Sequence, residues 1–598
     1  MTKSLRRSVS VGLVALVGSA LCGAVPPASA GVSAAALAGQ LLGRMSLEQK
    51  VGQMFVVSVW GKSADEVHPT NRTNYGVDTP AQVVERYNVG GVIYFNNSGT
   101  DNVDNPRQVA ELSNGLQRAA MRSGLRVPLI VAIDQEGGNV TRLEAPATEF
   151  PGNMSVGAGR SANDARSLAT INGHELRAIG INQNFAPVAD VNSNPLNPVI
   201  GARSFSSRPE LASELVRAEV RGYQDSGRAR ETVSSAAKHF PGHGDAATDS
   251  HTSLPIINRT EEEWRRIDLP PFQAAIAAGV DAIMTAHIEI PSLEPSGAPA
   301  TMSRRILTDL LRGELGYRGV IVTDSLGMGG ANVFPPEEIP VMAVEAGADE
   351  LLMPPNLELA KNAVINAVRS GRLTEQRIDQ SVLRILLQKL TRGIITNPLV
   401  DVNRVDRVVG TPANLAEVQR VSDATTTVLR NDAGLLPLRT RPSNVLVTGV
   451  GDTVLPARTP TWLANSLTQR GVTATALPTG TSPSEAVITQ AVTAAQNADL
   501  VVVLTNSLGT RAQLRALLTR LQATGKPVIA VATQIPYDPG FVDNPTWLAT
   551  YSWRAMSMES LAKVLLGEIA PHGKLPVDIP AGTDPATILY PFDTGLTW

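Results

Sequence analysis

The chain has 598 residues, of which 43% are hydrophobic and 18% are charged, and its formal net charge is −3. This length exceeds one ordinary hydrophobic core, so we expect two domains of different size. The body of the chain contains no basic block, which argues against nucleic acid as a partner because phosphate binding needs clustered Lys and Arg.

The first 30 residues have the pattern of a secretory signal peptide. A positively charged start is followed by the apolar run 11–25, and residues 28–30 are small, which predicts cleavage after Ala30. The apolar run is short for a membrane anchor. We therefore expect a secreted or cell-envelope protein that is not inserted in a membrane after cleavage.

The only cysteine of the chain, Cys22, lies inside this segment. Leu21 precedes it where lipoprotein processing needs a small residue, so a lipid anchor is disfavoured but stays open. If cleavage follows Ala30, the mature chain has no cysteine. That excludes disulfides, thiolate metal sites and a cysteine nucleophile.

From about residue 48 to residue 354, short apolar runs alternate with segments of helical periodicity. We predict strands at 51–59, 91–95, 127–134, 183–190, 234–240, 281–287, 319–324 and 349–353. We predict helices at 105–123, 163–179, 208–226, 261–278, 304–315 and 374–393. Eight strands with helices between them predict a (β/α)8 TIM-like barrel over residues 31–398, with a doubly wound open sheet as the alternative.

A linker over 399–415 and a smaller domain over 416–598 follow. A helix at 418–429 leads to strands at 445–450, 474–477, 500–505, 528–533 and 547–552, with helices at 484–498 and 511–524. This order predicts an α/β three-layer sandwich with a mostly parallel sheet. Gly449 and Gly451 follow its first strand, but the rest of a dinucleotide fingerprint is missing, so a tight turn explains them better.

Titratable residues end five of the predicted barrel strands. They are Asp134, Asp190, the pair Lys238 and His239, His287, and Asp324. A barrel brings the carboxyl ends of its strands to one rim, where active sites of this fold lie. One such residue is often only a helix N-cap, but five strand ends are hard to explain in that way.

The loop after the fifth strand is the richest in chemistry. Three of the seven histidines lie between residues 238 and 251, and Pro241 with Gly242 excludes a helix there. Asp249 stands two residues before His251, so its carboxylate can fix the imidazole tautomer and leave the other nitrogen for proton transfer. Asp324 ends a buried strand, which suits a nucleophile or an anion facing a developing cation.

A zinc site is a second interpretation of the same loop. His239, His243, His251 and Asp249 are suitable ligands by residue type. However, Pro241 and Gly242 prevent His239 and His243 from pairing on one helix, so the spacing gives this interpretation little support.

Together these motifs resemble those of a known family. The run from Lys238 to Gly244 with Asp249-Ser-His251 resembles the signature of the β-N-acetylhexosaminidases of glycoside hydrolase family 3, of the NagZ type. Segments 133–143, 184–190, 200–205, 283–287 and 322–328 resemble other barrel motifs of that family, and 566–576 resembles the end of its two-domain members. Many members carry Arg where this chain has Asn139.

The resemblance implies a retaining exo-β-N-acetylglucosaminidase without metal or cofactor. It implies Asp324 as the nucleophile that forms a covalent glycosyl-enzyme, His251 as the general acid/base and Asp249 as its dyad partner. It implies that the substrate is bound by Asp134, Arg142, Asp190, Arg203, Lys238, His239 and Met328. The expected substrate is a small N-acetylglucosamine-containing glycan, from peptidoglycan fragments or chitin, and we expect a monomer.

Three alternatives stay open. A family 3 β-glucosidase or xylosidase resembles the chain in both domains, but such enzymes commonly take their acid/base from the second domain. A neutral His251 leaves room for an anionic acceptor, so a phosphorylase is a further alternative. A catalytically inactive carbohydrate-binding protein is the alternative from another class.

Overall fold

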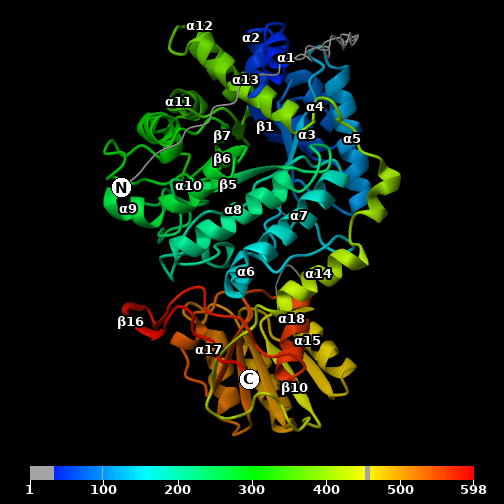
Figure 1. The fold of residues 1–598 in the computed structure, drawn as a ribbon, viewed down its shortest axis with the longest axis vertical. Helices are drawn as coiled ribbons and strands as arrows, with labels where there is room; N and C mark the ends of the chain where they lie inside the picture. The colour runs from blue at the N-terminus through cyan, green and yellow to red at the C-terminus, as the bar shows by residue number, and fades with distance from the viewer. Residues whose placement is uncertain (1–32, 97–98, 452–457) are drawn as a thin grey trace, which may run out of the picture.

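A computed structural model describes residues 33–96, 99–451 and 458–598 of the chain. The predicted signal peptide and Cys22 lie outside the described residues, so their interpretation stays a prediction. The described chain forms two domains that lie one above the other (Figure 1).

The first domain is the predicted barrel. Its parallel strands are β1 (Phe55–Ser58), β2 (Gly91–Tyr94), β3 (Ile130–Ile133), β4 (Gln183–Asn184), β5 (Ser234–Phe240), β6 (Ala282–Thr285), β7 (Val320–Val322) and β8 (Leu351–Leu352). They hydrogen-bond in the order β7-β6-β5-β4-β3-β2-β1-β8, and a single parallel bridge between Val322 and Glu350 joins the two ends of that order. The fold class predicted from the sequence is thereby confirmed, and the open sheet is excluded.

Helices surround this ring. They are α1 (Ala34–Leu42), α2 (Leu47–Gln53), α3 (Pro69–Tyr75), α4 (Pro80–Tyr87), α5 (Pro106–Arg122), α6 (Asn153–Gly159), α7 (Ala162–Ala178), α8 (Pro209–Asp225), α9 (Glu261–Ile267), α10 (Leu269–Ala277), α11 (Glu338–Ala346), α12 (Leu357–Arg369) and α13 (Glu375–Thr391). Short 3-10 turns, η1 (Gly201–Arg203) and η2 (Ala300–Met302), and the π-helical η3 (Arg305–Glu314) complete the barrel domain.

Several predicted elements of the barrel need correction. The strand expected at 183–190 spans only Gln183–Asn184, because Pro187 has no backbone N–H to continue the ladder. The strand expected at 51–59 begins only at Phe55, because Ser46 and Gln49 form a capping box that starts α2. The helix expected at 261–278 is broken at Asp268, since Pro270 and Pro271 follow at the start of α10.

The second domain is a three-layer α/β sandwich. Its strands are β9 (Thr427–Asn431), β10 (Val445–Gly449), β11 (Ala474–Pro478), β12 (Leu500–Thr505), β13 (Val528–Ala532) and β14 (Thr546–Ala549), in the order β11-β10-β12-β13-β14-β9. Helices α15 (Arg458–Gln469) and α18 (Ala555–Leu565) pack together, as do α16 (Glu485–Gln496) and α17 (Ala512–Gln522). The sheet is parallel except for β9, so the predicted class is confirmed.

The links at either end of this domain differ from expectation. The connection carries η4 (Val402–Arg407), and α14 (Pro412–Asp423) ends before β9, so the helix expected at 418–429 is wrong in its second half. The sequence also did not reveal β9, the short turn η5 (Asp538–Gly540), or the terminal hairpin of β15 (Ile579–Ala581) and β16 (Asp584–Tyr590). Gly449 has a φ of 112°, and a side chain there would meet the carbonyl oxygen of Leu504, which explains this glycine without a dinucleotide.

The two domains share buried contacts. Met154 and Ala158 of α6 pack into the hydrophobic core of the second domain. From the other side Arg554, which is 3% exposed, donates to the carbonyl oxygen of Gly138 at 3.0 Å and pairs with Glu144 at 3.2 Å. The segment between β3 and α7 is therefore held between the barrel and the second domain.

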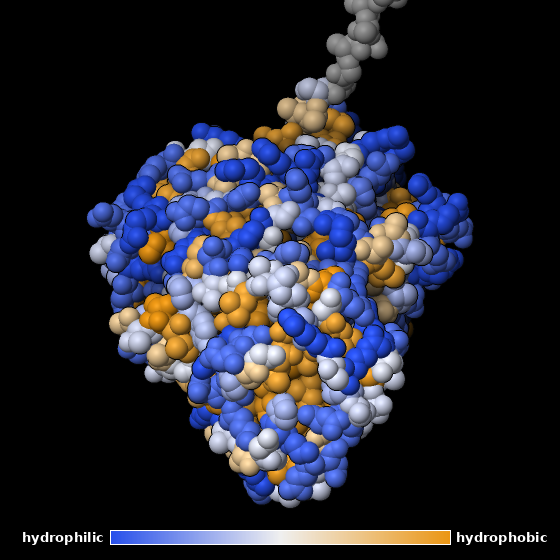
Figure 2. All heavy atoms as spheres, turned by 60° about the horizontal axis from the view of Figure 1, so that its bottom comes forward, coloured by the Kyte–Doolittle hydropathy of each residue, from blue (hydrophilic) through white to orange (hydrophobic). Residues whose placement is uncertain are grey.

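The surface seen from the end of the second domain is mainly hydrophilic, and its hydrophobic side chains gather in separate patches (Figure 2). Among the described residues, no helix combines the length and the apolar character needed to cross a membrane.

Candidate active site

The carboxyl ends of the barrel strands enclose a cavity of about 310 Å³. Among the described residues, all that line it belong to the barrel domain. The predicted site residues that line it are Asp134, Arg142, Arg203, Lys238, His239, His251, Asp324 and Met328. The two others, Asp190 and Asp249, do not line it but lie next to His239 and His251, which do.

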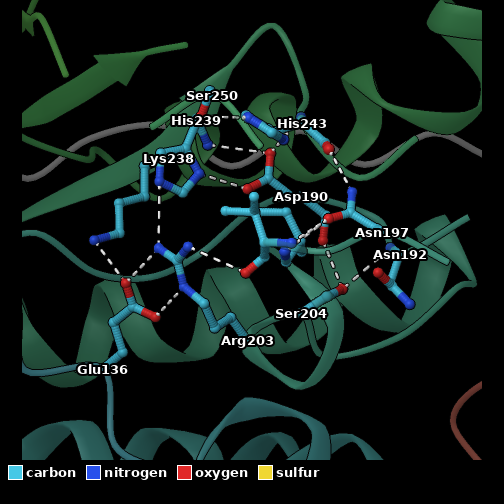
Figure 3. A network of polar contacts seen from close by, with 12 residues as sticks. Glu136, Asp190, Asn192, Asn197, Arg203, Ser204, Lys238, His239, His243 and Ser250 are labelled. Atoms are coloured by element: carbon cyan, nitrogen blue, oxygen red, sulfur yellow. Dashed lines mark hydrogen bonds and ion pairs between the residues drawn. The ribbon is translucent and has the colours of Figure 1, made fainter. Parts of the chain in front are cut away.

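Glu136 is the centre of the charge network on one wall. Its carboxylate lies 2.7 Å from Lys238 Nζ and accepts two hydrogen bonds from the Arg203 guanidinium, at 2.8 and 2.9 Å (Figure 3). Lys238 Nζ also lies 2.8 Å from Asp134 Oδ1. Burial by itself would raise the pKa of Glu136, but the charges of Arg203 and Lys238 outweigh it and hold that pKa below its ordinary value. Glu136 thus fixes both cations while ionised.

Sequence reasoning did not single out Glu136. Asp134 ends the run of β3, and Glu136 stands two positions beyond it, so both were available as carboxylates at the same strand end. Their spacing of two residues, which puts both carboxylates at one strand end, is the signal that could have found Glu136.

Asp190 is fully buried and acts on other site residues. Its Oδ2 lies 2.6 Å from His239 Nδ1, and its Oδ1 accepts the backbone N–H of His239 at 3.2 Å and of His243 at 2.7 Å. The protein therefore occupies this carboxylate, which holds the His239 ring between Asp190 and the Arg203 guanidinium (Figure 3). The structure places Asp190 one layer behind the substrate-binding position that the resemblance implied.

The Asp249–His251 pair forms the predicted geometry. Asp249 Oδ1 lies 2.7 Å from His251 Nδ1 and also accepts the backbone N–H of His251 at 2.8 Å. Burial would raise the pKa of Asp249, but the hydrogen bonds from the His251 backbone and ring lower it on balance. The side chains are 60% exposed for His251 and 40% for Asp249, so this pair can exchange protons with solvent.

Asp324 follows β7 at the opposite wall. Its Oδ1 accepts the backbone N–H of Ser325 at 2.7 Å. Burial would raise its pKa, but the neighbouring His239 and His287, that amide and Lys238 keep it below the ordinary value. His287, which is fully buried, lies with its Nε2 3.0 Å from the Ser325 carbonyl oxygen and so fixes the turn that carries Asp324.

The three histidines between residues 238 and 251 each contact another side chain of the protein. His239 faces Asp190, His251 faces Asp249, and His243 Nε2 lies 2.9 Å from Ser250 Oγ. In the part of the chain that the structure describes, no group of three or more His, Cys, Asp or Glu is arranged to hold a metal ion. The zinc interpretation of this loop gains no support.

The loop that carries Arg203 is braced by the second domain. At its start, Asn192 donates to the Tyr537 hydroxyl at 2.8 Å, and at its end Ser206 Oγ donates to the Pro576 carbonyl oxygen at 2.6 Å. Between them, Ala202 packs into the core of the second domain. No described residue of the second domain thus lines the cavity, but this domain holds the loop that carries Arg203, which does.

Comparisons with known proteins agree with this site. Residues 46–387 match the model of the glycosyl hydrolase family 3 N-terminal domain, and residues 426–598 match that of the family's C-terminal domain. The chain belongs to glycosyl hydrolase family 3, a class of enzymes that hydrolyse glycosidic bonds. The resemblance seen in the sequence motifs is confirmed.

Several relatives of this chain carry the names of particular family 3 activities. A β-hexosaminidase A of Pseudoalteromonas piscicida is 39% identical over 60% of this chain and 62% of its own length. A β-N-acetylglucosaminidase/β-glucosidase of Cellulomonas fimi is 30% identical over 77% of this chain and 85% of its own. The solved family 3 β-N-acetylglucosaminidase of Paenibacillus sp. str. FPU-7 is 38% identical, with a TM-score of 0.82 over 90% of this chain and all of that one. The chain is therefore similar to enzymes named for β-hexosaminidase and β-N-acetylglucosaminidase activity.

Replacing Glu136 by Gln keeps its shape and removes the charge that holds Lys238 and Arg203. We expect kcat/KM for an aryl β-N-acetylglucosaminide to fall about 10²-fold, since displaced binding groups misplace the sugar. Because the folded-state pKa of Glu136 lies below the unfolded value, its contribution to stability is present at neutral pH and is lost as pH falls through the folded pKa. The stability difference between wild type and variant should therefore shrink in acid.

As a control for this variant, Glu85→Gln removes an exposed carboxylate that lies 3.3 Å from Arg122. This control variant should leave kcat/KM and the stability of the protein nearly unchanged. Wild-type kinetics for Glu136→Gln at neutral pH would contradict the proposed role of this charge.

Replacing Tyr537 by Phe removes the hydroxyl that accepts from Asn192. We expect KM to rise about fivefold, the equivalent of roughly 1 kcal/mol for one hydrogen bond, with a smaller change in kcat. Tyr551→Phe is the matched control, because its hydroxyl bonds at 2.7 Å to Thr427 within the second domain. Equal KM values for the two variants would show that the brace does not act on the Arg203 loop.

Proposed function

We propose that this protein is a retaining exo-β-N-acetylglucosaminidase, with Asp324 as nucleophile, His251 as general acid/base and Asp249 as its partner. The observation that carries the proposal is the 2.7 Å contact between Asp249 and His251 beside a cavity whose other wall holds the ionised Asp324. The relatives named as β-hexosaminidase and β-N-acetylglucosaminidase support the choice of sugar.

In the first step, an Asp324 carboxylate oxygen attacks the anomeric carbon and the bond to the leaving oxygen breaks. His251 Nε2 gives its proton to that oxygen, and Asp249 stabilises the ring by accepting from Nδ1. In the second step, water passes a proton to His251 and its oxygen displaces Asp324 from the anomeric carbon. Two inversions retain the configuration.

Substrate binding follows from the charged wall. Asp134 offers acceptors to sugar hydroxyls, while Lys238, His239 and Arg203 offer donors. Arg142 stacks its guanidinium over the Phe95 ring at 5.2 Å and, like Met328, lines the cavity. A cavity of about 310 Å³ is of a size for one terminal sugar, which agrees with exo action.

The β-glucosidase alternative would draw its acid/base from the second domain. Among the described residues none from that domain lines the cavity, and this favours the His251 loop as the source. The double name of the Cellulomonas fimi relative keeps β-glucoside hydrolysis as a second candidate activity. A direct comparison of aryl β-N-acetylglucosaminide with aryl β-glucoside separates the two, and adding phosphate to the assay tests the acceptor.

The predicted signal peptide places the enzyme outside the cytoplasm in this proposal, as a secreted or cell-envelope monomer. Its substrates would then be glycans that end in N-acetylglucosamine, from peptidoglycan fragments or chitin. The N-terminal sequence of the exported protein, expected to begin at Gly31, tests this part separately.

The central prediction concerns two variants. Asp324→Ala should lower hydrolysis of an aryl β-N-acetylglucosaminide by about 10⁴-fold or more, and His251→Ala by about 10²–10⁴-fold. Azide should rescue His251→Ala by forming the β-glycosyl azide, because azide attacks the glycosyl-enzyme without a general base. Inversion at the anomeric carbon, or an α-azide from His251→Ala, would refute the assignment.

A further inference from the structure

Ser250, which lies between the two dyad residues, is buried where its neighbours are exposed. It is 2% exposed, whereas the side chains of Asp249 and His251 are 40% and 60% exposed. The loop therefore turns its serine inward, where it lines the cavity wall beside His243, and leaves its acid/base pair exposed. A serine held in this way is a point of attachment for the whole segment.

The partner of Ser250 is His243, which the proposed reaction does not use. His243 Nε2 lies 2.9 Å from Ser250 Oγ, and the ring is 2% exposed (Figure 3). Its backbone N–H donates to Asp190 Oδ1 at 2.7 Å, and Asn197 donates to its carbonyl oxygen at 2.9 Å. Burial lowers the pKa of His243 to about 4, so the ring is neutral at neutral pH and suits a hydrogen bond to a hydroxyl.

The same segment is attached on its other side to the loop of Asp324. The backbone N–H of Gly330 donates to the Ser250 carbonyl oxygen at 3.0 Å, and that of Gly329 donates to the His251 carbonyl oxygen at 3.0 Å. A Cβ added at Gly329 would lie 2.5 Å from backbone atoms of Thr252. The two loops approach this closely because glycine stands there.

We propose that the His243–Ser250 hydrogen bond and the two glycine amides form a clamp that sets the position of the Asp249–His251 pair relative to Asp324. His243 and Ser250 are then positioning residues, because they act through the dyad. This inference rests on the proposed roles of His251 and Asp249. It assigns a purpose to the third histidine of the loop and to the glycines that follow the nucleophile.

The clamp makes a specific kinetic prediction. Loosening it should slow proton transfer by His251, and slow transfer matters most when the leaving oxygen is basic. Ser250→Ala should lower kcat/KM about 10-fold for an alkyl or sugar aglycone, as a partial loss of general acid catalysis. With a dinitrophenyl aglycone, which leaves without protonation, the loss in kcat/KM should be less than about threefold.

Gly329→Ala tests the other side of the clamp and should show the same dependence on the leaving group. The matched control is Ser226→Ala, which removes a Ser–His hydrogen bond of 3.1 Å between the end of helix α8 and His174 of helix α7. Ser226→Ala should leave kcat/KM unchanged both for the alkyl or sugar aglycones and for the dinitrophenyl aglycone. Thermal unfolding of each variant identifies one that has lost its fold, and Ser250→Ala keeps the test available if Gly329→Ala is such a variant.

His251→Ala is measured in the same series to separate two failures. If it shows no dependence on the leaving group, the proposed acid/base role is wrong. If His251→Ala shows that dependence while Ser250→Ala and Gly329→Ala lower both series equally or leave both unchanged, the clamp is wrong and the dyad stands. The pH–rate profile of Ser250→Ala gives a further test. A shift in the limb that reports the ionisation of His251 would support the clamp.

Discussion

The ionised carboxylate of Glu136 is the constraint on which the binding wall depends. It places Lys238 at 2.7 Å and Arg203 at 2.8 Å although these residues come from different strands and loops. Without this anion the two buried cations would repel each other, and Lys238 would keep only Asp134 as an ionic partner. With it, their remaining N–H groups are fixed in direction, so a sugar meets donors that need no rearrangement.

The two sides of the proposed reaction have opposite environments, and each suits its task. Asp324 is surrounded by histidines, a lysine and a backbone amide, which keep it ionised as a nucleophile must be. The Asp249–His251 pair stands at the exposed edge, where it can pass a proton to a departing sugar and take one from water. A buried imidazole such as His243 could not be protonated near neutral pH, which separates the structural histidine from the catalytic one.

Much of this was accessible from the sequence because parallel strands leave long apolar runs and a barrel gathers their carboxyl ends on one rim. The eight strands and Asp324 followed from those two rules, and the Asp249–His251 pair followed from its spacing of two residues in the loop after the fifth strand. The contacts between loops did not follow, because they join residues far apart in the chain. Glu136, the burial of Asp190 and the clamp on Ser250 belong to this kind.

The contacts between the second domain and the barrel also join residues that are far apart in the chain. Its core accepts Ala202, and its Tyr537 and Pro576 bond to the two ends of the loop that carries Arg203. A loop that crosses the barrel rim without such support would sample many positions, and each ordered residue costs roughly 1–2 kcal/mol of conformational entropy. By bonding the loop before any sugar arrives, the second domain meets part of that cost during folding. The second domain thus supports the binding wall through the Arg203 loop, although no described residue of that domain lines the cavity.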